Sequence, residues 1–195
     1  PYRFAGAGVG GWVELGRTTL GSAGDTISVA SLADKRYYMV LGNHLPSGNF
    51  RTTYRLNNDS GSNYALRKSE DGGAENVTTS ITDITSGNED TNTQYFDVSY
   101  LSNLSAQEKL IINHNMRSGG TGAPKRVEAV SKWANTSAQI TQTTVTDSGN
   151  GFDTGSNLSV LGSEITPAIV TPAIPAIPSL MPNLPMNMSL KVPIA

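Results

Sequence analysis

The chain has 195 residues, which is enough for one domain of ordinary size with extensions. It contains no cysteine, which excludes disulfides, a thiolate nucleophile and a cysteine-type zinc site. The net charge is −2 at pH 7 and no basic stripe is visible, so we expect no direct contact with nucleic acid. No stretch reaches the roughly 18 unbroken apolar residues of a spanning helix, so we expect no membrane span.

The first eleven residues, PYRFAGAGVGG, are rich in glycine and predict an extended N-terminal arm over 1–11. Gly6, Gly8 and Gly11 fit the spacing G-x-G-x-x-G. A dinucleotide-binding turn also needs a strand before it and a helix after it, and neither is expected here. We therefore favour an arm or a closely packed backbone over a dinucleotide site.

From Trp12 onward, short segments of alternating apolar and polar residues are separated by polar turn sequences. The predicted strands are 12–20, 26–30, 36–45, 50–56, 64–68, 75–84, 93–101, 108–116, 126–134, 139–146 and 157–162. We expect 50–56 and 64–68 to pair as a hairpin across the turn-rich NNDSGSN sequence. The segment 104–110 is expected to form one helical turn at most. The pattern predicts an all-β fold, an antiparallel β-sandwich that is jelly-roll-like, over residues 12–163.

Alternation also predicts the core. Two strand faces are defined by Leu110, Ile112 and His114 and by Val127, Ala129, Ser131 and Trp133. Further core residues are expected at Tyr38, Val40, Phe96, Val98 and Ile140. We interpret Trp12 and Trp133 as packing anchors rather than as ligand platforms.

The composition changes after Gly162, and residues 164–195 form a separate proline-rich segment. Seven of the ten prolines lie between Pro167 and Pro193. Because proline fixes φ and removes the amide donor, the segment favours polyproline II with three residues per turn. At about 3.1 Å per residue it reaches roughly 90 Å. We predict an extended C-terminal arm that docks on another subunit through Pro172, Ile174, Pro175, Ile177, Pro178, Leu180, Pro182 and Leu184. The alternative is that the segment docks along its own sandwich.

The sequence offers little for catalysis or for a cofactor. His44 and His114 lie on separate predicted strands without H-x-H or H-E-x-x-H spacing, and G-x-S-x-G is absent. Oxygen ligands from Asp147, Asn150 and Asp153 fit a calcium ion, although loop caps explain the same residues. We expect no enzyme, no cofactor and no metal. Asn-x-Ser/Thr sequences, whose glycosylation depends on the host, start at Asn58, Asn76, Asn103, Asn135, Asn157 and Asn187.

Four stretches carry a resemblance: GGWVELGRTTLGSAGDTISVASL, RLNNDSGSNYALR, APKRVEAVSKWANTSAQIT and GFDTGSNLSVLG. Over about residues 11–162 the chain resembles a loosely characterised group of short β-rich structural proteins of tailed phages, archaeal viruses and marine metagenomes. The resemblance implies a virion surface or tail component with a jelly-roll-like sandwich. Its motifs are structural rather than catalytic, and the proline-rich segment lies outside it.

Three functions fit these features. The favoured one is a virion structural protein, a capsid decoration or cement subunit or a tail component, that assembles with itself and with other virion proteins through its arms and sheet edges. The second is a subunit of a cell-surface filament or sheath, which uses the same contacts with helical symmetry. The third is a carbohydrate-binding module, in which Trp12, Tyr37, Tyr54 or Tyr100 stacks on a glycan.

Overall fold

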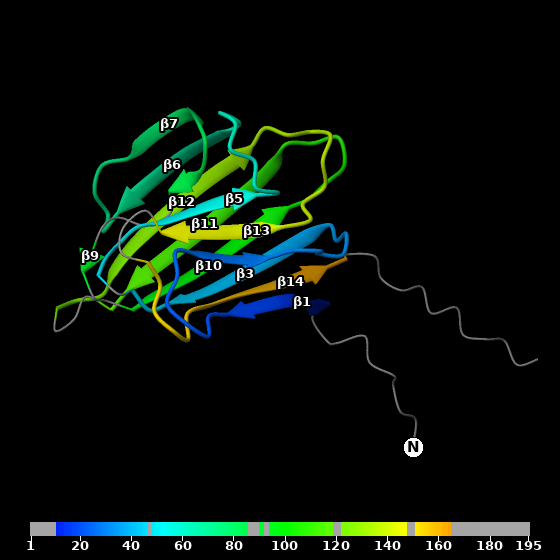
Figure 1. The fold of residues 1–195 in the computed structure, drawn as a ribbon. Coiled ribbons are helices and arrows are strands. Elements are labelled where there is room, and N and C mark those ends of the chain that lie inside the picture. Colours follow the sequence, from blue (N-terminus) through cyan, green and yellow to red (C-terminus); the bar gives the residue numbers. More distant parts are fainter. Residues whose placement is uncertain are drawn as a thin grey trace, which may run out of the picture. The chain divides into compact units, whose positions relative to one another are not determined.

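The structure of the protein is a computed structural model. It describes residues 11–46, 48–85, 90–91, 94–118, 122–147 and 151–164. These residues form strands, turns and loops and contain no helix, which confirms the predicted all-β class. The larger sheet has eight antiparallel strands (Figure 1). In spatial order they are β1 (Trp12–Thr19), β14 (Asn157–Ser163), β3 (Tyr37–His44), β10 (Tyr95–Ser102), β11 (Lys109–Arg117), β12 (Lys125–Trp133), β6 (Tyr64–Glu70) and β7 (Asn76–Ile81).

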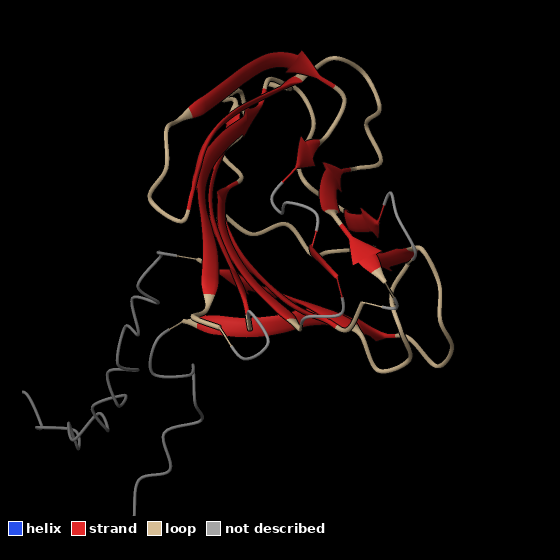
Figure 2. Cartoon of the chain, turned by 90° about the vertical axis from the view of Figure 1, so that its left-hand side faces the viewer, coloured by secondary structure: helices blue, strands red, loops and turns tan. Residues whose placement is uncertain are grey.

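A smaller antiparallel sheet faces one side of the larger one, and Figure 2 shows the two layers of the sandwich. Its strands in spatial order are β2 (Thr26–Val29), β13 (Thr143–Asp147), β5 (Thr52–Leu56) and β8 (Ile84–Thr85). A short ribbon pairs β4 (Asn49–Phe50) with β9 (Asp90–Thr91). We call the side of the large sheet that faces the small sheet its inner face, and the opposite side its outer face.

The strand order is that of a jelly roll with two additional hairpins. If β1, β2, β3, β5, β8, β10, β13 and β14 are counted 1 to 8 along the chain, four lie in the order 1-8-3-6 and the others in the order 2-7-4-5. The β6–β7 and β11–β12 hairpins are inserted between these strands, and β6 pairs with β12. The hairpins therefore widen the large sheet on one side, beyond β10.

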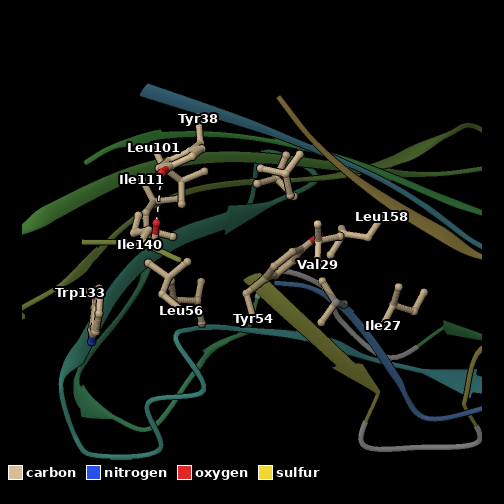
Figure 3. Close-up of a cluster of buried hydrophobic side chains, with 14 of the residues drawn as sticks. Ile27, Val29, Tyr38, Tyr54, Leu56, Leu101, Ile111, Trp133, Ile140 and Leu158 are labelled. Carbon is tan, nitrogen blue, oxygen red and sulfur yellow. Dashed lines mark hydrogen bonds between the residues drawn. The ribbon is translucent and has the colours of Figure 1, made fainter. Parts of the chain in front are cut away.

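Apolar side chains from both sheets fill the space between them (Figure 3). Tyr38, Val40 and Ile140 are each 1% exposed, which confirms them as core residues. The Tyr38 hydroxyl donates a hydrogen bond to the carbonyl oxygen of Ile140 at 3.0 Å, so a polar group in this layer is satisfied. Trp133 is equally buried and stacks on Tyr64, with 6.4 Å between the ring centroids. It is a packing anchor, as predicted.

The expected hairpin between 50–56 and 64–68 is wrong. β5 pairs with β13 and β8 in the small sheet, whereas β6 pairs with β12 and β7 in the large one. Asn57 and Asn58 both adopt the left-handed conformation, with φ of 52° and 54°, which asparagine tolerates better than most residues. This turn carries the chain from one sheet to the other. The predicted strand 75–84 is divided in the same way between β7 and β8.

The predicted core face of β10 and β11 is also wrong. Phe96 is 42% exposed and Val98 is partly exposed, while Leu110, Ile112 and His114 lie on the outer face. The inner positions of these strands include polar residues that bond to one another, such as Asn113, which donates to Ser99 at 2.7 Å. Alternation separates the two faces of a strand, but it does not identify the inner one when polar groups satisfy each other inside. The face Val127, Ala129, Ser131 and Trp133 does point inward.

Candidate functional site

The outer face of the large sheet carries a continuous row of cross-strand neighbours. The pairing register places one residue of each strand side by side, in the order Leu161, Met39, Tyr100, Ile112, Val130, Arg67 and Val77. Six of these seven residues are apolar or aromatic. Directly opposed side chains in adjacent strands lie close enough to contact, so the row forms an apolar stripe that runs across the strands from β14 to β7.

A hollow of about 910 Å³ lies over the part of this stripe from Tyr100 to Val77 and extends beside it to Ser163 on β14. Its outer-face lining includes Trp12, Tyr37, Ala65, Val77, Tyr100, Leu110, Ile112, Val130 and Ser163. Trp12 and Tyr100 meet edge to face, with 6.5 Å between their ring centroids and 61° between their planes. Trp12 is only partly buried, so it packs against Tyr100 and also presents part of its surface to the hollow, unlike the buried Trp133.

Several large apolar side chains in the hollow are about half exposed: Val77 is 54%, Leu110 59%, Ile112 52% and Val130 50% exposed. A contiguous apolar patch of this kind is uncommon on a soluble monomer and marks a binding surface. The patch lies on regular, paired strands rather than on loops. The hollow is therefore a rigid platform, and its shape is set by the twist of the sheet.

The charged groups at the rim of the hollow are paired. The Arg67 guanidinium contacts the Glu75 carboxylate, and the Lys132 ammonium lies 2.9 Å from the Glu108 carboxylate. Because each of these cations has an anion beside it, neither gives the hollow a net charge. The chemistry of the surface therefore suits an uncharged, apolar partner with some hydrogen-bonding groups, and suits a phosphate or a carboxylate ligand poorly.

A second cluster of chemically active side chains lies between the sheets. The Nε2 atom of His44 lies 2.7 Å from Oδ2 of Asp97, and the two side chains are 0% and 1% exposed. Asn115 donates a hydrogen bond to the other carboxylate oxygen of Asp97. Burial, followed by the nearby Asp97 charge, raises the pKa of the Tyr54 hydroxyl well above its usual value.

This inner cluster is closed to substrate. A cavity of only about 20 Å³ lies beside it, lined in part by Tyr54, Ser99 and Asn113. Such a volume holds about one water molecule, which is too little for an organic substrate. We therefore assign the His44–Asp97 pair a structural role, in which the buried groups fix the register of β3 against β10.

The other residues singled out from the sequence have various positions. The arm residues Pro172 to Leu184 lie outside the described residues, as does Asn150. Asp147 is mostly buried and accepts backbone hydrogen bonds from Arg51 at 2.8 Å and from Gly151 at 2.6 Å, so its carboxylate caps a loop. Asp153 is exposed. Within the described ranges, no group of three or more His, Cys, Asp or Glu side chains is placed to hold a metal.

The NNDSGSN turn acts as a structural junction rather than as a binding loop. Asp59 accepts hydrogen bonds from Trp133 Nε1 at 2.6 Å, from Asn63 at 2.9 Å and from the Gly61 amide at 2.8 Å. Burial alone would raise the pKa of Asp59, but these hydrogen bonds outweigh it and lower the pKa below its usual value.

One of the predicted glycosylation sequences is buried. Asn103 is 2% exposed, so its Asn-x-Ser sequence is closed to glycosylation in the folded chain.

Comparison of the chain with protein-family models, with curated proteins and with solved structures found no match. Within the described part of the chain, no helix is long and apolar enough to cross a membrane. Sequence reasoning missed the outer hollow, although the repeated apolar residues at Leu110, Ile112 and Val130 were a signal for it.

Proposed function

We propose that the protein is a structural subunit of a virion, a capsid decoration or cement protein or a tail component, that assembles with copies of itself and with other virion proteins. The observation that carries this proposal is the apolar hollow on the outer face of a rigid sheet. A half-exposed stripe of Tyr100, Ile112 and Val130 resembles the apolar centre of a subunit interface, where aromatic and aliphatic side chains lose their contact with water.

The fold supports the same proposal at the level of analogy. Jelly rolls are used by viral capsid proteins and by lectins, and fold alone does not choose between them. The paired rim charges favour a protein partner with an apolar surface. Within the described residues, β1 and β7 are the edges of the large sheet, and such edges can pair with strands of other subunits.

Two alternatives differ in what they predict for the purified full chain. A subunit of a cell-surface filament or sheath would use the same hollow but would propagate with helical symmetry. A carbohydrate-binding module would use the exposed parts of Trp12 and Tyr100 as stacking surfaces and would not need to self-associate. Their edge-to-face contact provides less flat ring surface than two coplanar rings would.

Negative-stain microscopy of the full chain, together with glycan-array binding, separates these functions. We expect rings, shells or other closed particles and no glycan signal above background. Open helical filaments would contradict a capsid decoration or cement subunit and favour a filament or sheath subunit. A chain that remains monomeric and binds a defined glycan would overturn the virion proposal in favour of carbohydrate binding.

A further inference from the structure

We propose that the outer hollow binds the proline-rich segment of a second copy of this chain, so that each subunit inserts its C-terminal arm into a neighbour. This inference rests on the proposed function, because it names the contact through which the subunits assemble. The segment that we place in the hollow is 172–182, which presents Pro172, Ile174, Pro175, Ile177, Pro178, Leu180 and Pro182.

The chemistry of the two partners matches. Pro172, Pro175 and Pro178 are spaced by three residues, which favours polyproline II, and such segments dock in grooves lined by aromatic residues. The hollow supplies Trp12, Tyr37 and Tyr100 together with aliphatic side chains. Each of these rings also carries an N–H or O–H donor. A proline-rich strand has few amide donors but retains its carbonyl acceptors, so it can accept these hydrogen bonds.

Charge leads to the same partner. The segment 172–182 contains no charged residue, and the rim cations Arg67 and Lys132 are each paired with a carboxylate. An uncharged strand therefore enters the hollow without breaking an ion pair or burying an isolated charge. A charged peptide would have to do one or the other, at a cost in free energy.

The lengths also agree. Ser163 on β14 and Val77 on β7 both line the hollow and are separated by six strand-to-strand steps, which at about 4.8 Å per step is about 29 Å. The ten residue steps from Pro172 to Pro182 span about 31 Å in polyproline II at 3.1 Å per residue. The repeat in the segment can therefore fill the hollow from end to end.

The end of β14 lies at a place that favours docking of the segment 172–182 on a second copy rather than in the hollow of its own subunit. Ser163, the last residue of β14, lines one end of the hollow. The nine residues from Glu164 to Pro172 already span about 28 Å when extended, which is the length of the hollow. On its own subunit the extended chain would therefore reach the far end before the proline repeat begins. On a second copy, the repeat can lie within the hollow.

Because the chain has no cysteine, paired cysteine variants of the full chain test this contact. Chains with Ile112→Cys are mixed with chains with Ile177→Cys under mild oxidation, and Met116→Cys replaces Ile112→Cys in the control. Met116 is on the same strand and face and is 48% exposed, but it does not line the hollow. We expect a disulfide-linked heterodimer in at least about tenfold excess over the control, because docking raises the effective concentration of the thiols.

Three results would overturn the inference. They are equal cross-linking of both pairs, a dominant link between two Ile112→Cys chains, and an exclusively intrachain link in the chain that carries both cysteines. If circular dichroism shows that Ile112→Cys does not fold, Val130→Cys with Ile174→Cys repeats the test. The mass of the reduced mixture distinguishes failure of the arm contact from failure of the proposed function. Chains that assemble without forming the cross-link contradict only the docking of 172–182 in the hollow. Chains that stay monomeric contradict the proposed function as well.

Discussion

Ile111 and Ile112 are neighbours on β11 with opposite environments, and truncating each of them tests which face of the large sheet is inside. Ile111 is 5% exposed and belongs to the core, whereas Ile112 is 52% exposed. Ile→Ala removes about three carbon groups, worth about 0.8 kcal/mol each when buried. When the cavity left by the side chain is included, we expect Ile111→Ala to lower the free energy of unfolding by about 3 kcal/mol. Ile112→Ala should cost about 1 kcal/mol, because half of its surface is already in water.

Urea unfolding followed by circular dichroism measures the difference. A gap of about 2 kcal/mol, with a slope of about 2 kcal/mol per molar urea, separates the two midpoints by about 1 M. The experiment is run at a protein concentration low enough for the chain to be monomeric, so that contacts between subunits do not contribute. A lower midpoint for Ile112→Ala would show that the sheet has the opposite face inside, since a slip of one residue exchanges the faces. Equal midpoints would contradict the difference in burial between the two side chains.

Three further predictions concern polar groups that are buried or partly buried. Asp97→Ala leaves His44 buried without its carboxylate partner and should lower the free energy of unfolding by about 3–5 kcal/mol. Asp97→Asn is the control and should lower it less, and small, equal losses for the two variants in urea unfolding would contradict the pairing. Since the pKa of Asp59 is lowered in the folded chain, the ionised carboxylate stabilises the fold above about pH 4, and this stabilisation is lost as the pH falls through the folded pKa. The melting temperature of Asp59→Asn should therefore change less on acidification than that of the wild type. Burial raises the pKa of Tyr64 to about 12, so the contribution of Tyr64 to the free energy of unfolding should fall as the pH rises from about 10 through this value. In an ultraviolet absorbance titration, Tyr64→Phe should remove one tyrosine that ionises late.

The strand pattern was predictable because the turns between strands have clear sequence signals. The segment NNDSGSN ended one strand and began the next, as expected, but the sheet to which each strand belongs depended on tertiary contacts. Asn57, for example, donates to the carbonyl oxygen of Gln139 and accepts from the amide of Thr141, residues that are distant in the sequence. The jelly-roll class was therefore predictable, whereas the pairing of 50–56 with 64–68 was not.

The candidate site was much less predictable than the fold. Phe96, Ile112 and Val130 are as apolar as core residues, so a rule that places apolar residues inside assigns them to the core. Their exposure follows from the inner polar groups, of which Asp97 and Asn115 bond to each other across two strands. Such pairing requires knowledge of the register, which a single sequence does not supply. The arm residues 172–184 lie outside the described residues and remain a prediction.

Light scattering of the full chain over a range of concentrations measures its mass in solution and so tests whether the hollow joins subunits. Ile112→Arg places a charge in the hollow, and Met116→Arg places the same charge on the same face outside it. We predict that the wild type and Met116→Arg assemble into particles of several subunits and that Ile112→Arg remains monomeric. A monomeric wild type, or an Ile112→Arg variant that assembles like the wild type, would contradict the claim that the hollow joins the subunits.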